Sequence, residues 1–282
     1  MESEKILITG AGSGIGKLTA LTLSKIGKDV IATTETTEQA ALLEEDARAL
    51  NIPLQIEKID ITKAQDRQKA WKWEIDILVN NAGISEGGSL VDVPENNFRN
   101  QFETNVFGTL LLTQGFARQM IRKNSGRIIF ITSISGLMAN AFSGSYVSSK
   151  YALEGIASTL SQELMEYNVE VATVNHGPFL TGFNDEEFER YRNWPANPKE
   201  YTFNPEKLSF PLKQYPPKKA IAPTIRVILG KTKSYRNIVP KIMTPVVKSM
   251  EIFEWIRRTS WFLGKRHFMA QKSMDMEPAT RK

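Results

Sequence analysis

Short apolar runs alternate along the chain with longer stretches in which apolar residues recur every three or four positions. We expect strands at 5–9, 29–33, 53–59, 75–79, 126–132 and 169–174, with helices up to 25 and at 38–50, 63–73, 98–121 and 145–167. Nearly continuous apolar strands that alternate with helices are typical of a parallel sheet covered on both faces. The pattern therefore predicts a single α/β domain, a doubly wound parallel sheet in three α/β/α layers.

The pattern changes after residue 177. Residues 182–217 are rich in aromatic residues and proline, which predicts an ordered but irregular excursion. Such a segment fits the lid or wall of a pocket, and it fits a surface insertion packed on itself equally well. A helix at 218–229, a strand at 237–239 and a final helix at 244–263 follow, the last with Val246, Val247 and Met250 along one side. We accordingly expect a main domain over 1–240 that contains 182–217 as an insertion, and a helical extension over 241–282.

Composition disfavours several classes of protein. The chain has 282 residues, no cysteine, and only two histidines, His176 and His267. Disulfide frameworks and thiolate metal sites are therefore excluded, and no metal is expected. No apolar run approaches the roughly 20 residues that span a bilayer, so a soluble, cytoplasmic protein is expected.

Positive charge is concentrated toward the C-terminal end. The net charge is +5, and lysine and arginine outnumber acidic residues from 218 to 282. Such an excess fits a solvated face, and it also fits contact with an anionic membrane surface or with nucleic acid. We expect no nucleic acid partner and rank contact with a membrane surface below the solvated face.

Three glycines lie between the first predicted strand and the first predicted helix. Gly10, Gly14 and Gly16 would allow a tight turn and a close approach of the backbone to a diphosphate. The helix N-terminus would offer its free N–H groups to that anion. A phosphate loop of the nucleoside triphosphatase type fits less well, because it requires glycine at Ala11 and serine or threonine at Leu18. The loop therefore favours a dinucleotide.

A serine, a tyrosine and a lysine follow the fifth predicted strand. Ser133 stands at the end of that strand, and Tyr146 and Lys150 lie four residues apart, which puts them on one face of a helix. An ammonium beside a phenol favours the phenolate and would lower the tyrosine pKa from about 10 toward neutrality. The pair is therefore a candidate acid/base device, although the same spacing is common on helix surfaces.

The order and spacing of these motifs resembles the classical short-chain dehydrogenases/reductases. The matching residues are the glycine loop from Thr9 to Gly16, Asp60, the Asn-Asn-Ala-Gly run at 80–83, Asn105, Ser133, and Tyr146 with Lys150. The stretch 144–183 is similar to the estradiol and retinol dehydrogenases of that family. The resemblance implies a Rossmann-type fold and an NAD(P)-binding catalytic domain over 1–240. It also implies an oxidoreductase that interconverts a hydrophobic secondary alcohol and its ketone by hydride transfer.

The resemblance also implies a role for individual residues. Tyr146 would be the acid/base, Lys150 would lower its pKa and hold the nicotinamide ribose, Ser133 would place the reacting oxygen, and Asn105 would anchor a proton-relay water. The cofactor would be held by Gly10, Ser13, Gly14, Ile15, Gly16, Glu35, Asp60, Ile61, Asn81, Ala82, Gly83, Tyr146, Lys150 and Thr181. The family usually carries proline where this chain has His176, and we interpret that change as local packing.

The form of the cofactor depends on residues near the end of the second strand. Glu35 would repel a 2′-phosphate and could accept a hydrogen bond from a 2′-hydroxyl, which favours NAD over NADP. Lys17 would restore NADP binding if its side chain turned inward. The acidic residues at 185–189 disfavour an anionic substrate, unless their side chains face solvent. The resemblance implies a homodimer or homotetramer, and the alternative function is that of a cofactor-sensing regulator without turnover.

Overall fold

We analysed a computed structural model of the chain, which describes residues 4–259 apart from 196, 198, 199, 205, 207 and 211, with the backbone alone at 251 and 253–259. Its centre is a sheet of seven parallel strands in the order β3-β2-β1-β4-β5-β6-β7. The strands are β1 (Lys5–Ile8), β2 (Asp29–Thr34), β3 (Gln55–Lys58), β4 (Ile77–Asn80), β5 (Gly126–Ser133), β6 (Val169–His176) and β7 (Arg236–Val239). The predicted doubly wound α/β fold is confirmed.

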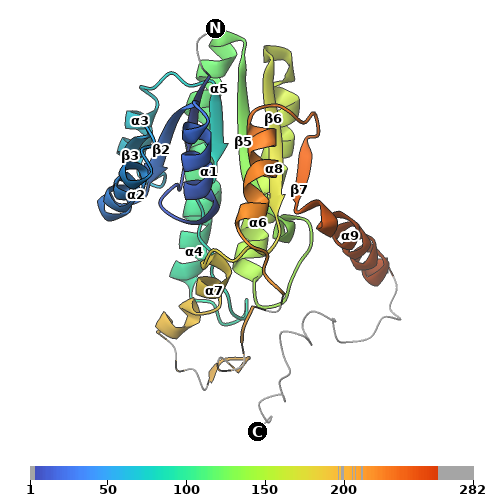
Figure 1. Ribbon diagram of the computed structural model, residues 1–282. Coiled ribbons are helices and arrows are strands. Elements are labelled where there is room, and N and C mark those ends of the chain that lie inside the picture. The colour runs from blue at the N-terminus through green and yellow to red at the C-terminus, as the bar shows by residue number, and fades with distance from the viewer. Residues whose placement is uncertain are drawn as a thin grey trace.

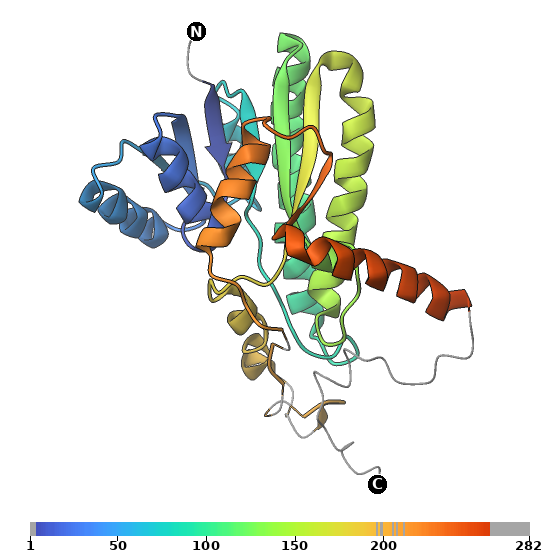
Figure 2. The same ribbon diagram turned by 45° about the vertical axis from the view of Figure 1, so that its right-hand side comes forward.

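Helices cover both faces of this sheet (Figures 1 and 2). Alternate residues of each strand point to opposite faces, so Ile6 and Ile8 join one buried cluster and Leu7 joins the other. The first cluster includes side chains of α1 (Gly14–Lys25), α2 (Thr37–Ala49) and α8 (Lys218–Ile228), and the second those of α3 (Ala64–Ala70), α5 (Thr109–Lys123) and α6 (Gly144–Glu163). Both faces of the sheet are therefore dry, which explains the unbroken apolar runs of the strands.

The strand order reverses between β1 and β4. The chain moves outward from β1 through β2 to β3, then returns to the other side of β1 and continues to β7. The connecting loops diverge at this point and leave a crevice beyond the carboxyl ends of the strands, where ligands of open α/β sheets bind. The fold therefore places the glycine loop after β1 and the Asn-Asn-Ala-Gly run after β4 on opposite sides of one crevice.

The single long helix predicted at 98–121 is interrupted. It consists of α4 (Glu95–Phe102), a π-helical segment η1 (Glu103–Gly108) and α5. The π-helical turn contains Asn105, which is fully buried. Gly115 on α5 faces the ring of Trp71, whose indole N–H donates to the Leu112 carbonyl at 3.0 Å. Gly115 is therefore a close-packing position, and the helix continues through it.

The aromatic excursion lies below the carboxyl edge of the sheet in Figure 1. It begins with α7 (Phe183–Glu187) and a 3-10 turn, η4 (Arg190–Asn193). A buried cluster of its own holds it together, formed by Phe188, Tyr191, Trp194, Tyr201, Phe203 and Leu208. Polar contacts fix it to the 86–92 loop, because the Trp194 indole donates to Glu86 Oε1 at 2.7 Å and Thr202 Oγ1 donates to Asp92 at 2.7 Å. The segment packs on itself, and it also forms part of a pocket wall, because Phe183, Asn184 and Glu186 line the cavity described below.

The final helix α9 (Thr244–Thr259) follows a 3-10 turn, η7 (Lys241–Met243), and extends away from the sheet (Figure 2). Val247 near its start is buried against Ile134, Leu137 and Met138. Val246 is 51% exposed, so the predicted apolar stripe is wrong at that position. Residues 260–263 of the predicted helix lie outside the described residues. Among the residues described, the helices are all too short or too polar to cross a membrane.

Candidate active site

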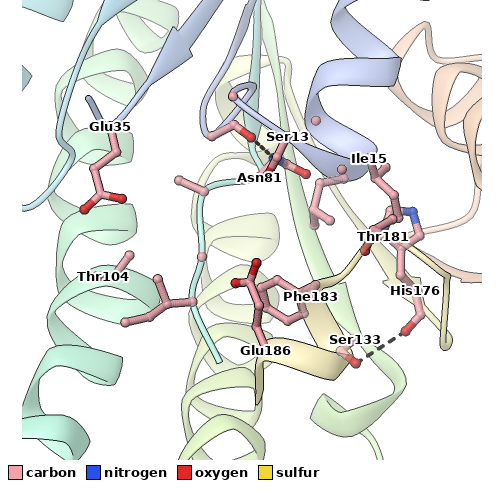
Figure 3. Close-up of a pocket in the computed structure, with 18 of the residues that line it drawn as sticks. Ser13, Ile15, Glu35, Asn81, Thr104, Ser133, His176, Thr181, Phe183 and Glu186 are labelled. Carbon is pink, nitrogen blue, oxygen red and sulfur yellow. Dashed lines mark hydrogen bonds between the residues drawn. The ribbon is translucent and has the colours of Figure 1, made fainter. Parts of the chain in front are cut away.

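A cavity of about 230 Å³ occupies the crevice beyond the carboxyl ends of β1, β4, β5 and β6 (Figure 3). Every residue predicted to hold the cofactor lines it: Gly10, Ser13, Gly14, Ile15, Gly16, Glu35, Asp60, Ile61, Asn81, Ala82, Gly83, Tyr146, Lys150 and Thr181. Ser133 lines it as well, whereas Asn105 does not. Figure 3 shows Glu35 and Ser133 toward opposite ends of the cavity, with Phe183 and Glu186 between them. The cavity thus brings together residues that lie more than a hundred positions apart in the sequence.

The glycine loop needs its glycines for two physical reasons. Gly10 and Gly14 have φ values of 64° and 56°, in the left-handed region that side chains disfavour. A Cβ on Gly10 would lie 2.6 Å from the Ala82 Cα, and a Cβ on Gly16 would collide with the Asn81 amide. The loop therefore packs directly against the segment after β4 and leaves its backbone open at the start of α1. This cradle fits a diphosphate on a helix N-terminus.

Asn81 braces the glycine loop. Its side-chain amide donates to the carbonyls of Thr9 and Gly10, both at 2.9 Å. The Thr9 hydroxyl in turn accepts from the backbone N–H groups of Asn81 and Ala82, both at 3.0 Å. The Asn81 side chain thus fixes the position of the loop while also lining the cavity.

Asp60 is held by the turn that follows β3. Its Oδ1 accepts from the backbone N–H and the hydroxyl of Thr62, at 2.9 and 2.7 Å. Its own N–H donates to Asp66 Oδ2 at 2.7 Å, and Asp66 also pairs with Lys58. These contacts fix the Asp60 carboxylate at the wall of the cavity, next to Ile61.

The end of β2 carries an acidic residue and no inward-facing lysine. Glu35 is exposed and lines the cavity, and its N–H donates to the Gln39 side chain at 3.1 Å. Lys17 forms an ion pair with Asp46 of α2, so its side chain is directed to the outer helix. Thr34 is buried and donates to the Thr36 carbonyl at 2.9 Å. Within the described lining, Lys150 is the sole lysine or arginine.

Ser133, Tyr146 and Lys150 meet at the inner end of the cavity. Ser133 ends β5, and its hydroxyl accepts from the Ser135 N–H at 3.0 Å and donates to the His176 carbonyl at 3.3 Å. Tyr146 and Lys150 lie on the first turns of α6 and are both more than nine-tenths buried. The Lys150 Nζ lies 5.5 Å from the Tyr146 ring centroid and donates to the Ile131 carbonyl at 3.1 Å. The three groups are thus brought together by one strand and one helix.

The pKa values of this pair differ from the sequence-based expectation. Burial and the negative charge of Glu187 raise the pKa of Tyr146, and a hydrogen bond with Ser133 only partly offsets them. Burial lowers the pKa of Lys150 to about 8, against the opposing charge of Glu154. The predicted decrease of the tyrosine pKa is therefore not present in this state, because desolvation of the phenol outweighs the cation near its ring.

Asn105 lies behind the cavity wall. Its side chain accepts from the Ile84 N–H at 2.8 Å and donates to the Ile84 carbonyl at 2.9 Å and to Ser149 at 3.0 Å. A Cβ on Gly83 would have Asn105 Oδ1 at 3.2 Å and Lys150 Nζ at 3.7 Å, so the two side chains flank Gly83. The Asn105 side chain is thus fully used in holding the chain after β4 in place, and its role in proton relay stays a prediction.

His176 and Thr181 form the far wall. His176 is buried, its Nε2 lies 2.9 Å from the Thr224 hydroxyl, and burial together with the charge of Lys150 lowers its pKa to about 3. The ring is therefore neutral and packs edge-on against Phe179. Thr181 faces Gly14, where a Cβ would lie 3.5 Å from the threonine Cβ. The site closes around the glycine loop through this contact.

The comparison with known families agrees with this geometry. The model of the short chain dehydrogenase family matches residues 4–192, from the first strand through α7 and into η4. The chain belongs to the short-chain dehydrogenase family. It is therefore an oxidoreductase of a family that uses NAD(P) and in which redox chemistry of alcohols and ketones is typical.

Several short-chain dehydrogenases are similar along most of the chain. The oxidoreductase YusZ of Bacillus subtilis is 36% identical over 71% of this chain and 74% of its own length. The 3-ketodihydrosphingosine reductase of Bacteroides thetaiotaomicron is 34% identical over 66% and 67%. A crystal structure of a short-chain dehydrogenase from Streptomyces avermitilis covers 92% of this chain and 97% of its own, with 25% identity and a TM-score of 0.74.

The structure adds residues to the site that the sequence did not single out. Gln39, Thr104, Phe183, Asn184 and Glu186 line the cavity of this short-chain dehydrogenase. Phe183 packs against Tyr146 with ring centroids 5.7 Å apart. The only signal for the last three was the run of mixed acidic and aromatic residues after 182. Their place at the cavity depends on α7, a helix too short to give a periodic pattern.

Proposed function

We propose that this short-chain dehydrogenase interconverts a hydrophobic secondary alcohol and its ketone, with NAD as the preferred cofactor. The observation that carries the proposal is the meeting of Ser133, Tyr146 and Lys150 at the inner end of the cavity. When bound, NAD(P) would supply the hydride acceptor for the carbinol carbon or the hydride donor for the ketone, and Tyr146 would accept or donate the proton of the substrate oxygen.

The residues around the reacting oxygen support distinct roles. The Ser133 hydroxyl is fixed by its contacts with Ser135 and His176, so it can position the substrate oxygen beside the Tyr146 phenol. Tyr146 holds or releases the proton, and Lys150 places a positive charge close to its ring. The fixed glycine cradle fits the diphosphate of the cofactor, and Asp60 and Ile61 fit its adenine side.

The preference for NAD is supported by the charges at the end of β2. A 2′-phosphate there would meet the Glu35 carboxylate, whereas a 2′-hydroxyl could donate to it. Lys17, which would favour NADP, is engaged with Asp46 instead. We therefore expect a higher kcat/KM with NAD than with NADP.

The class of substrate is supported by the walls beyond the catalytic residues. Phe183 packs against Tyr146 within the main cavity, and Phe188, Phe210 and Leu212 line the smaller cavity that adjoins it. Among similar proteins, a retinol dehydrogenase of Bos taurus is 32% identical over 66% of this chain and 62% of its own length. Together with the 3-ketodihydrosphingosine reductase, it supports a long apolar substrate.

An oligomer is part of the proposal. Phe107, Leu111 and Tyr151 on η1, α5 and α6 are between 38% and 48% exposed, which leaves apolar surface on the outer helices. A homodimer or homotetramer that covers these helices is expected, and the protein is proposed to act in the cytoplasm. Nothing favours the alternative of a regulator without turnover, since the acid/base pair is complete.

The test is a panel of hydrophobic alcohols and ketones assayed by cofactor absorbance with NAD(H) and NADP(H) in parallel. The proposal predicts turnover of secondary alcohols or ketones with an apolar chain and a preference for NAD(H). Absence of turnover with every member of the panel, in a protein that binds cofactor, would support the regulator instead. A preference for NADP(H) would overturn only the role of Glu35 in selecting NAD, and it would leave the proposed reaction standing.

A further inference from the structure

A second, smaller cavity of about 40 Å³ adjoins the catalytic residues on the side opposite the glycine loop. Ser133 and Tyr146 line both cavities. The remaining walls come from the 134–143 segment, the 177–178 turn, α7 and the aromatic excursion: Ile134, Ser135, Asn140, Ala141, Ser143, Gly177, Pro178, Asn184, Glu187, Phe188, Phe210 and Leu212. A group in this space would therefore lie within a few bonds of the reacting oxygen.

Glu187 is the acidic residue of this second cavity. Its side chain is only 3% exposed, and it is the last residue of α7. The Glu187 carbonyl accepts from the Gly87 N–H at 2.9 Å, and a Cβ on Gly87 would lie 2.6 Å from that carbonyl oxygen. The backbone is thus locked to the 85–88 loop. A carboxyl group held this rigidly at a buried position beside Tyr146 is costly unless something pairs with it.

Two acceptor atoms of this cavity lack partners. Asn140 Oδ1 and one carboxyl oxygen of Glu187, Oε1, are buried without a hydrogen-bond partner among the described residues, although the Ser143 and Ser85 hydroxyls interact with the Glu187 carboxyl and lower its pKa. Most buried polar atoms in folded proteins have a partner, so two orphaned acceptors on one small cavity indicate a ligand group that donates. One of them carries charge when ionised. A single group with several N–H donors and a positive charge would satisfy both.

The surrounding charges favour a cation as that group. Glu86 is buried nearby, where its Oε1 accepts from the Trp194 indole, and its charge adds to that of Glu187. Burial and then Glu86 raise the pKa of Glu187 to about 7, while the hydroxyls of Ser143 and Ser85 act in the opposite direction. The described lining of this cavity contains no lysine or arginine. An anionic group would be repelled, and a hydroxyl would satisfy only one acceptor.

We propose that Glu187 and Asn140 bind a protonated primary amine of the substrate, carried one or two carbons from the carbon that bears the reacting oxygen. The substrate class would then be an amino alcohol and its amino ketone, with the apolar chain directed to the aromatic excursion. An ammonium donates three hydrogen bonds and accepts none. It can therefore donate to the two unpaired acceptor atoms, and it needs no hydrogen-bond donor from the protein. The inference rests on the proposed function, since it takes Ser133 and Tyr146 as the place of the reacting oxygen.

This arrangement has a consequence for turnover as well as for binding. The charge of Glu187 raises the pKa of Tyr146, and an ammonium between them would offset that charge. A substrate with the amine therefore restores an easier release of the Tyr146 proton, whereas one without it leaves the carboxyl unpaired. Glu187 is in this sense a specificity-determining residue whose effect should appear in kcat and in KM.

The test compares an α-amino ketone with the ketone of the same carbon chain that lacks the amine, using NADH and the full-length protein. We expect kcat/KM for the amino ketone to be at least about 100-fold higher, because a site with buried polar groups rejects an analogue that leaves them unpaired. Glu187→Gln should reduce this preference to about tenfold or less, because it weakens binding of the amino ketone and removes the charge that the amine-free ketone leaves unpaired beside Tyr146. Glu189→Gln, an exposed neighbour on the same segment, is the matched control and should keep the wild-type preference.

The outcomes separate the two proposals. Equal kcat/KM for both ketones, or a preference that survives in Glu187→Gln, would overturn the amine site and leave the dehydrogenase function standing. If neither ketone is turned over, calorimetric titration of the matching amino alcohol decides: binding that is lost in Glu187→Gln supports the amine site, and no binding overturns it. If the amine-free alcohol binds with the same affinity as the amino alcohol, the amine contributes nothing to binding, and the amine site is overturned.

Discussion

The ammonium of Lys150 lies over the ring of Tyr146, 5.5 Å from its centroid, and donates its hydrogen bond to the Ile131 carbonyl. It therefore acts on the phenol through space, from the face of the ring. Both side chains are more than nine-tenths buried, so their mutual field is weakly screened. The charge state of Lys150 is thus expected to control the acidity of Tyr146.

The first prediction concerns the pH dependence of turnover. Lys150 has a pKa lowered to about 8, so it is charged below pH 8 and neutral above. We expect kcat/KM for ketone reduction to fall above pH 8, by about tenfold per pH unit, because the neutral amine no longer supports the phenolate. Glu154→Gln should move this fall to lower pH, since the Glu154 charge raises the lysine pKa. A profile that is flat from pH 7 to 10 would contradict this role.

The second prediction concerns the choice of cofactor. Glu35→Arg replaces a carboxylate that faces the cavity with a guanidinium, which can pair with a 2′-phosphate. We expect the ratio of kcat/KM for NADP to that for NAD to rise about 10- to 100-fold, as a charged hydrogen bond is worth about 1.5–3 kcal/mol. Lys17→Met is the control and should leave the ratio unchanged, because Lys17 pairs with Asp46. A changed ratio in Lys17→Met together with an unchanged ratio in Glu35→Arg would place the cofactor ribose beside Lys17.

The third prediction concerns stability. Glu187 has a folded-state pKa raised to about 7 from 4.5, so between these values the folded protein keeps a proton that the unfolded chain has released. Stability from this group is present below pH 4.5 and lost as pH rises through 7. Glu187→Gln should therefore gain up to about 3 kcal/mol in unfolding free energy relative to wild type between pH 4.5 and pH 8.

Denaturant unfolding at the two pH values measures this difference. Glu189→Gln, at an exposed position two residues from Glu187, should show no such change. A difference between Glu187→Gln and wild type that is the same at both pH values would mean that the Glu187 carboxyl is solvated.

The fourth prediction concerns the start of α9. Val247 is completely buried in a cluster with Ile134, Leu137 and Met138, which follow β5. Its neighbour Val246 is 51% exposed. Val247→Ala should lower the unfolding free energy by about 1–3 kcal/mol through loss of packing, and Val246→Ala should change it little. Thermal or denaturant unfolding of the two variants measures the contrast. Equal effects would indicate that the first turns of α9 do not dock as described.

The sequence was sufficient for the architecture and for most of the residues that line the main cavity. Unbroken apolar strands predicted a parallel sheet, and once the strand order is known, Gly10, Asp60 and Gly83 must meet at one edge. Local motifs of this kind are readable because each is tied to the end of a strand. Asn105 could not be interpreted from spacing alone, because its contacts with Ile84 and Ser149 depend on a π-helical turn.

The second cavity was beyond the sequence. Glu186 and Glu187 are adjacent in an acidic run, yet Glu186 is exposed at the main cavity and Glu187 is buried beside Tyr146. A helix of one turn gives no periodicity that would separate them. Asn140 and Gly87 come from distant loops: Asn140 lines the same small cavity as Glu187, and the Gly87 N–H donates to the Glu187 carbonyl. Such contacts are set by tertiary packing, which no local pattern records.

Replacement of Tyr146 by phenylalanine tests the central claim most directly, with turnover and NAD(H) binding measured on the same preparation. Phenylalanine preserves the ring that packs against Phe183 and Lys150 and removes only the phenol oxygen. We predict a loss of about 10²- to 10⁴-fold in kcat, the range for a general acid/base, with cofactor affinity unchanged. Wild-type turnover in Tyr146→Phe would contradict the account.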